Sequence, residues 1–270
     1  MGATTRAVRD LEVTFDERGG GSPVVLIHGF PFNHTMWRGQ AEALGENYRV
    51  ITPDLRGHGG TGLGVGATAS SMEEMATDVA ALLDELNVSE RVILGGLSMG
   101  GYVTLAFYRL FPQRVRALVL ADTRPQSDTE EARGAREETA RRALREGMQT
   151  VADAMLPKLL APSTPEEKPE VFERVREMIL TTRPEGAAAA LRGMAARRDQ
   201  TDLLQEIDVP TLIVVGSEDA ITPPKDSETM HRAIRGSRLV VIEGAGHVSN
   251  LERPTEFNRA LEDFLKGIES

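Results

Sequence analysis

The chain of 270 residues contains no cysteine, which excludes disulfide bonds and thiolate metal ligands. Its start, MGATTRAVRDLEVTF, lacks the apolar segment of a secretory signal. No hydrophobic run approaches the roughly 20 residues that a membrane-spanning helix needs. We therefore expect a cytoplasmic protein, and the missing cysteines fit a reducing compartment.

Clusters of basic residues are also missing, and the net charge is −10. Such a chain repels nucleic-acid phosphates and anionic lipid. Charged residues make up 27% of the sequence and hydrophobic residues 40%, as in ordinary globular proteins. We expect a small-molecule partner, no nucleic acid, no membrane, and a monomer or homodimer.

Short apolar, β-branched runs alternate with helix patterns along most of the chain. Continuous apolar runs of this length are typical of strands buried on both faces of a parallel sheet. The clearest helix pattern follows Ser71, which has capping-box spacing to Glu74. The sequence predicts an α/β fold with a doubly wound, mostly parallel sheet. The predicted strands cover 23–29, 48–55, 91–96, 115–122, 210–216 and 238–244.

The alternation stops between residues 126 and 206, where only helical patterns and scattered prolines occur. An all-helical insertion between two strands of one sheet is best interpreted as a lid. We expect a core domain of residues 1–125 and 207–270, with 126–206 inserted as a helical cap. The glycine-rich segment 56–70 is expected to be a mobile loop.

The segment LGGLSMGGYV, residues 94–103, places Ser98 between Gly96 and Gly100, directly after a predicted strand and before a helix. A nucleophilic serine on a sharp strand-to-helix turn needs small residues two positions away on each side. The Met99 amide then lies at the helix N-terminus, where it can stabilise a developing oxyanion. Glycines that only let a helix pack on the sheet, as in a dinucleotide site, are the alternative, but GxGxxG is absent.

A serine hydroxyl needs a base, and histidine oriented by a carboxylate is the usual one. His247, in the loop GAGHVSNLERP after the last strand, is the best placed of the five histidines. We assign packing, surface or loop-bracing roles to the other four histidines: His28, His34, His58 and His231.

Carboxylates follow two predicted strands. Glu218 and Asp219 follow one strand in GSEDAITPP, and Asp122 ends another in LVLADT. The order Ser98, Asp219, His247 is the one expected of an α/β-hydrolase, so Asp219 is preferred. Asp122 is the alternative acid, because it also ends a strand.

Five segments resemble the α/β-hydrolase-fold family, and most of all its branch of 3-oxoadipate enol-lactonase-like enzymes and small carboxylesterases. They span nearly the whole chain except the cap: LIHGFPFNHTMW, DLRGHGGT, GLSMGGYVTLAFYRLFPQRVRALVLADT, VPTLIVVGSEDAITPP and IEGAGHVSNLERPTEF. The resemblance implies that Ser98 is the nucleophile, His247 the base and Asp219 the orienting acid. It also implies an oxyanion hole formed by the backbone amides of Phe30 and Met99.

The cap departs from this resemblance. Residues 126–146 are strongly charged and match no lactonase signature, and their arginines have the i,i+4 spacing of a solvated helix face. Several apolar residues either line an adaptable acyl pocket or fill gaps in the core. The candidate pocket residues are Trp37, Met148, Met155, Met178 and Val248, with Met194 as a further methionine of the cap.

These features predict a serine hydrolase without metal or other cofactor that cleaves small carboxylic esters or lactones. Three alternatives stay open: a 3-oxoadipate enol-lactonase proper, a perhydrolase that uses peroxide instead of water, and a ligand sensor built on a hydrolase fold.

Overall fold

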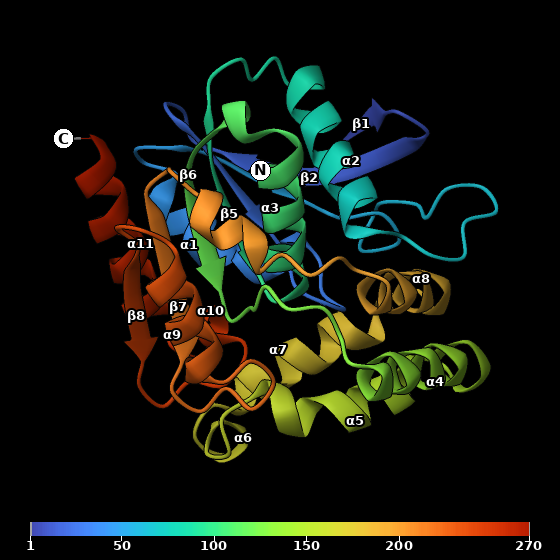
Figure 1. Cartoon of the computed structure of the whole chain (residues 1–270). Coiled ribbons are helices and arrows are strands. Elements are labelled where there is room, and N and C mark those ends of the chain that lie inside the picture. The colour runs from blue at the N-terminus through green and yellow to red at the C-terminus, as the bar shows by residue number, and fades with distance from the viewer. Residues whose placement is uncertain (1, 270) are drawn as a thin grey trace.

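A computed structural model describes residues 2–269, and within this range eight strands form one sheet (Figure 1). Their order across the sheet is β1-β2-β4-β3-β5-β6-β7-β8. The strands are β1 (Thr4–Val8), β2 (Leu11–Arg18), β3 (Pro23–Ile27), β4 (Arg49–Pro53), β5 (Val92–Leu97), β6 (Val115–Ala121), β7 (Thr211–Gly216) and β8 (Arg238–Ile242).

Strands β3 to β8 are parallel to one another. They correspond to the six predicted strands, and every residue of β3, β5 and β7 is buried. Helices on both faces bury these strands, which explains their unbroken apolar sequences. The α/β fold with a mostly parallel sheet is confirmed.

The strands β1 and β2 were not predicted. They form an antiparallel hairpin at the edge of the sheet, and β2 pairs antiparallel with β4. The sequence of β2, LEVTFDER, places its buried residues mainly on one face, with charged residues between them. A pattern search for continuous apolar runs misses a strand of this kind.

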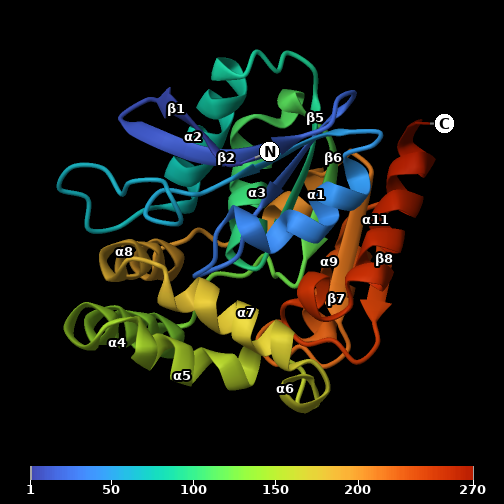
Figure 2. The same cartoon turned by 180° about the vertical axis from the view of Figure 1, so that it is seen from behind.

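Two layers of helices cover the sheet. Helices α1 (Arg38–Leu44) and α11 (Pro254–Glu269) pack together on one face, seen in front in Figure 2. Helices α2 (Met72–Glu85) and α3 (Met99–Leu110) pack together on the other face, seen in front in Figure 1. Helix α9 (Pro224–Ala233) packs on β7 and β8. Within residues 2–269 no helix combines the length and the apolar character needed to span a membrane.

The predicted capping box of α2 forms only in part. Ser71 Oγ accepts a hydrogen bond from Glu74 N–H at 3.1 Å, as expected of an N-cap. The Glu74 carboxylate pairs instead with Arg56, at 3.0 Å. The cap of α2 therefore relies on Ser71.

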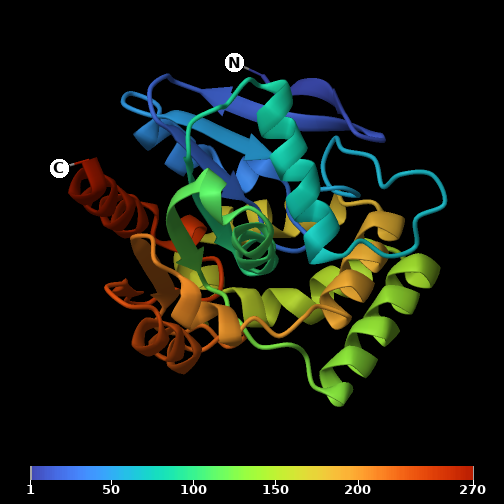
Figure 3. The same cartoon turned by 45° about the horizontal axis from the view of Figure 1, so that its top comes forward.

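Five helices lie between β6 and β7 in the chain, beyond the carboxyl ends of the parallel strands (Figures 1 and 3). They are α4 (Glu130–Glu146), α5 (Met148–Leu159), α6 (Thr164–Glu167), α7 (Pro169–Leu180) and α8 (Pro184–Ala195). Helix α8 ends at Ala195, and a short 3-10 helix (Asp202–Glu206) follows it before β7. We call α4 to α8 the cap.

Hydrogen bonds hold the cap to the glycine-rich segment 56–70. Ser70 N–H donates to Ala189 O at 3.1 Å, and Arg183 donates to Thr61 O. Val65, in the middle of the segment, is fully exposed. Arg192 of α8 also donates to Thr68 O at 3.1 Å, so the segment is anchored near Thr61 and at Thr68 to Ser70, with Val65 exposed between these points.

Candidate active site

Ser98 lies on the turn between β5 and α3, with φ 56° and ψ −113°. The turn is tight on both sides. A Cβ added at Gly96 would collide with Gly100 O, and one added at Gly100 would collide with Ile27 O of the neighbouring strand β3. Glycine is therefore required at both positions, and the serine backbone is strained.

Three side chains from three strand ends form a hydrogen-bonded chain. Ser98 Oγ lies 2.8 Å from His247 Nε2, and His247 Nδ1 lies 2.8 Å from Asp219 Oδ2. His247 and Asp219 are 2% and 3% exposed, whereas Ser98 is partly exposed. The structure thus brings together the three residues that the sequence predicted, with the hydroxyl as the accessible end.

Asp219 is held as an ionised acceptor. Its Oδ1 accepts from the N–H groups of Ile221 and Thr222, at 2.8 and 2.9 Å, and its Oδ2 accepts from Thr222 Oγ1 at 2.8 Å. Burial alone would raise the pKa of Asp219, but His247 and these donors outweigh it and lower the pKa below its usual value. Thr222 Oγ1 also lies 3.3 Å from His247 Nδ1. Thr222 is not among the site residues predicted from the sequence.

Asp122, the alternative acid, is fully buried at the end of β6 with φ 45°. Its Oδ1 accepts from Gly216 N–H at 2.9 Å, and its Oδ2 accepts from Ser249 Oγ at 2.5 Å. Burial and the nearby charge of Asp219 raise the pKa of Asp122 well above its usual value. Asp122 therefore braces the strand ends around the site, and the carboxylate hydrogen-bonded to His247 is that of Asp219.

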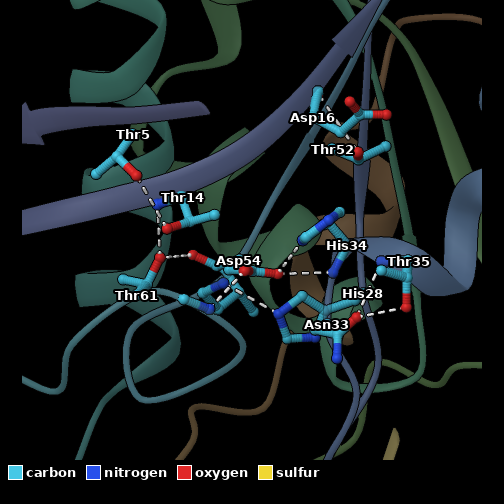
Figure 4. Close-up of polar contacts among 12 residues, drawn as sticks. Thr5, Thr14, Asp16, His28, Asn33, His34, Thr35, Thr52, Asp54 and Thr61 are labelled. Carbon is cyan, nitrogen blue, oxygen red and sulfur yellow. Dashed lines mark hydrogen bonds and ion pairs between the residues drawn. The ribbon is translucent and has the colours of Figure 1, made fainter. Parts of the chain in front are cut away.

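The other four histidines have partners away from Ser98. His28 and His34 lie near Asp54 at the end of β4 (Figure 4), where His34 Nδ1 is 2.8 Å from Asp54 Oδ1 and His28 Nε2 accepts from Leu55 N–H at 3.0 Å. His231 Nδ1 lies 2.9 Å from Ser237 Oγ on the surface.

His58 is fully buried and lies beside His28, with 5.1 Å between the ring centroids and a tilt of 54° between the ring planes. Burial and the neighbouring imidazole lower the pKa of His58 to about 3. A neutral ring at this depth braces the loop after β4. These contacts agree with the packing and loop-bracing roles predicted for the four residues.

The two residues predicted to form the oxyanion hole, Phe30 and Met99, follow neighbouring strands. Phe30 follows β3 and Met99 follows β5, and these strands are paired with Ile27 opposite Gly96. No side chain caps the N-terminus of α3, so its first N–H groups stay directed toward the Ser98 turn. This is the arrangement that a developing negative charge beside Ser98 would need.

The candidate pocket residues have different surroundings. Trp37 is 1% exposed and packs on Phe257 of α11, with 5.9 Å between ring centroids. Trp37 therefore packs against α11, and its place in the pocket stays a prediction. Met148 and Met178 are each 5% exposed, Met155 is partly buried, and Val248, beside His247, is buried. Met194 is also buried in the cap.

The charged helix α4 faces solvent, as predicted. Its arginines form i,i+4 pairs on the surface, Arg141 with Glu137 at 3.1 Å and Arg142 with Glu146 at 3.3 Å. These two pairs lie on the surface, whereas Arg136 of the same helix pairs with the buried carboxylate of Asp128. Within the described residues, no group of three or more His, Asp or Glu side chains could hold a metal ion.

The profile of one protein family, the alpha/beta hydrolase fold, matches residues 22–254. The chain belongs to this family. A 3-oxoadipate enol-lactonase of Acinetobacter baylyi is 31% identical over 264 residues, which cover 97% of this chain and 96% of that protein.

Two solved structures of similar enzymes extend this likeness. A thermophilic esterase from Thermogutta terrifontis, solved with malate bound, is 43% identical over the full length of both chains, with a TM-score of 0.96. The enol-lactonase from Burkholderia xenovorans LB400 is 29% identical with a TM-score of 0.89, covering 97% of this chain and 100% of its own. The predicted resemblance to enol-lactonases and esterases is confirmed, and the chain is a hydrolase of this type.

Proposed function

We propose that the protein is a serine hydrolase that cleaves small carboxylic esters or lactones through an acyl-enzyme on Ser98. One observation carries the proposal: the uninterrupted chain of two 2.8 Å contacts from Ser98 Oγ through His247 to Asp219. A hydroxyl becomes nucleophilic when an adjacent base takes its proton and a third group orients that base.

In the first half-reaction, His247 Nε2 takes the proton of Ser98 Oγ as the oxygen attacks the carbonyl carbon of the substrate. Asp219, accepting from Nδ1–H, fixes the tautomer and stabilises the imidazolium. The amides of Phe30 and Met99 donate to the oxyanion of the tetrahedral intermediate. The proton then passes from Nε2 to the leaving alkoxide, and Ser98 carries the acyl group.

In the second half-reaction, water attacks the acyl carbon while His247 Nε2 takes its proton. Collapse of the second tetrahedral intermediate returns this proton to Ser98 Oγ and releases the carboxylic acid. A lactone follows the same path, but its leaving alkoxide stays attached to the acyl chain and the product is a hydroxy acid.

The test compares the wild type with Ser98→Ala on p-nitrophenyl acetate and on a γ-lactone. We expect the variant to lose at least about 10⁴-fold in kcat without a change in melting temperature. Ser89→Ala, on an exposed turn, is the matched control. A p-nitrophenyl phosphonate should label Ser98 in the wild type, as read by peptide mass spectrometry, and retained acyl transfer in Ser98→Ala would refute the proposal.

A 3-oxoadipate enol-lactonase is the second candidate, favoured by the relative from Acinetobacter baylyi. A panel of p-nitrophenyl esters of rising chain length, γ- and δ-lactones, the enol-lactone, and peroxide with acetate separates the possibilities. Highest kcat/KM on the enol-lactone identifies this enzyme, and peracid formation above hydrolysis identifies a perhydrolase. Stoichiometric retention of a ligand with no turnover identifies a sensor.

We also propose that cap residues Met148, Met155 and Met178, with Val248 beside His247, line the acyl pocket. Unbranched, polarisable methionine side chains adapt to chains of different length. Met148→Phe should shift the preferred acyl chain length and leave acetate turnover within about twofold. A uniform loss on all chain lengths together with a lower melting temperature would place Met148 in the core instead.

A further inference from the structure

A third buried carboxylate lies beside the His247 loop and has no part in the proposed chemistry. Glu252, the last residue of α10 (Ser249–Glu252), is 0% exposed. Its Oε1 accepts a hydrogen bond from Gly246 N–H at 2.8 Å, one residue before His247. A buried carboxylate is costly unless donors surround it, so its remaining partners decide its role.

Those partners belong to the cap. Glu252 Oε2 accepts from Ala161 N–H, between α5 and α6, at 2.8 Å and from Thr164 Oγ1, at the start of α6, at 2.6 Å. Lys168 Nζ donates to the backbone carbonyl of Glu252 at 2.5 Å. One side chain thus joins the His247 loop to a segment about 90 residues away in the sequence.

The backbones meet at the same place. His247 N–H donates to Leu159 O at the end of α5, at 2.9 Å. A Cβ added at Gly246 would lie 2.5 Å from Ala161 N and 2.6 Å from Leu160 C. The His247 loop is therefore in direct contact with the cap, and the Glu252 carboxylate accepts hydrogen bonds from both the loop and the cap.

We propose that Glu252 is a positioning residue for His247. By tying Gly246 to cap segment 159–164, it holds the imidazole in line between Ser98 and Asp219. The inference rests on the proposed function, in which His247 transfers the protons. Both carboxylate oxygens are occupied by donors of the protein, so Glu252 acts through His247 and not on the substrate.

Glu252→Gln tests this role with a minimal change of shape. Both carboxylate oxygens accept hydrogen bonds from N–H or O–H donors. The glutamine side chain has only one oxygen, so its NH₂ group must face donors on one side, and the hydrogen bonds on that side are lost. We expect kcat on p-nitrophenyl acetate to fall about 10- to 100-fold, because a displaced proton acceptor is costly, while KM changes less than about threefold. Glu256→Gln, the same change at an exposed residue of α11, should keep wild-type kcat.

A double-mutant cycle separates positioning from general structural damage. In the Asp219→Asn background, where His247 has already lost its orienting partner, Glu252→Gln should cost much less than in the wild type. Equal losses in both backgrounds would show that Glu252 does not act through His247. Unchanged kcat in Glu252→Gln would also overturn the proposal.

Amide hydrogen exchange gives a readout that does not depend on activity. Faster exchange in Glu252→Gln should be confined to the peptides around Gly246 and Ala161, and unchanged exchange there would refute the contact's role. If Glu252→Gln does not fold, Thr164→Val, which removes a single donor, should give a smaller loss of kcat and the same local pattern. A wild type that hydrolyses neither an ester nor a lactone would refute the proposed function, and the exchange result would then still test the contact between Glu252 and the cap.

Discussion

The ends of β6 and β7 carry two buried aspartates in opposite electrostatic states. Asp219, after β7, has its pKa lowered by His247 and by the donors of its own turn. Asp122, at the end of β6, has its pKa raised by burial and by the charge of Asp219. The difference teaches that in neighbouring buried carboxylates the number and type of donors decides which one carries the charge.

Replacing the charged member of this pair should have the largest effect. Asp219→Asn keeps the shape but favours the wrong tautomer of His247, so kcat should fall by about 10³- to 10⁴-fold. The measurement is kcat on one p-nitrophenyl ester at pH 8, with a melting curve to confirm folding. A loss below tenfold would mean that His247 works without this acid.

Weakening the donor set around Asp219 should have an intermediate effect. Thr222→Val removes the hydroxyl that donates to Asp219 Oδ2 at 2.8 Å. A hydrogen bond to a charged group contributes about 1.5–3 kcal/mol, so we expect kcat to fall about tenfold. Thr222→Ser restores the hydroxyl and should recover most of the loss, and a serine variant as slow as the valine variant would contradict this assignment.

The neutral member should tolerate the same replacement. Asp122→Asn keeps an acceptor for Gly216 N–H and supplies a donor toward Ser249, so kcat should fall less than about tenfold. The assay is the one used for Asp219→Asn. A larger loss of kcat in Asp122→Asn than in Asp219→Asn would assign the orienting role to Asp122 instead.

The pH dependence of stability should separate the two residues by sign. The pKa of Asp219 is lower in the folded protein than in the unfolded chain, where it is near 3.8. Asp219 therefore stabilises the fold at pH values above 3.8, and this contribution is lost as the pH falls through the folded pKa. The pKa of Asp122 is higher in the folded protein than in the unfolded chain. Its contribution to stability is therefore fully present at pH values below 3.8 and is lost as the pH rises through the folded pKa.

Melting temperatures of Asp219→Asn and Asp122→Asn, measured from pH 4 to pH 8 against the wild type, test these signs. At pH 7 Asp219→Asn should melt below the wild type and Asp122→Asn above it. The Asp122→Asn difference should shrink toward pH 4, whereas the Asp219→Asn deficit should persist at pH 4, because the folded pKa of Asp219 lies below 3.8. Parallel changes of the same sign in the two variants would refute the assignment of opposite charge states.

Much of this site was predictable because its parts are local. The turn around Ser98 needs glycine at positions 96 and 100, and a continuous apolar strand precedes it, so a short stretch of sequence identifies it. The order of Ser98, Asp219 and His247 along the chain follows from the fold. The six parallel strands were found for the same reason, because burial on both faces leaves an unbroken apolar run.

The remainder depends on contacts between distant segments. The sequence favours Asp219 and leaves Asp122 as the alternative acid, and only the packing shows that the carboxylate hydrogen-bonded to His247 is that of Asp219. Glu252 was not singled out, since its partners in the cap lie about 90 residues away. The contact of the Trp37 ring with Phe257 of α11 joins segments about 220 residues apart and is likewise not visible in the sequence.

The positive φ of Ser98 lowers the stability of the fold at the same residue that the proposed activity requires. A non-glycine residue held in this region costs on the order of 1–3 kcal/mol, whereas glycine adopts it without steric conflict. Ser98→Gly should therefore fold more stably than the wild type and be inactive. Directed evolution that screened this protein for heat resistance alone would reward loss of the proposed nucleophile, so a useful screen must require turnover in every round.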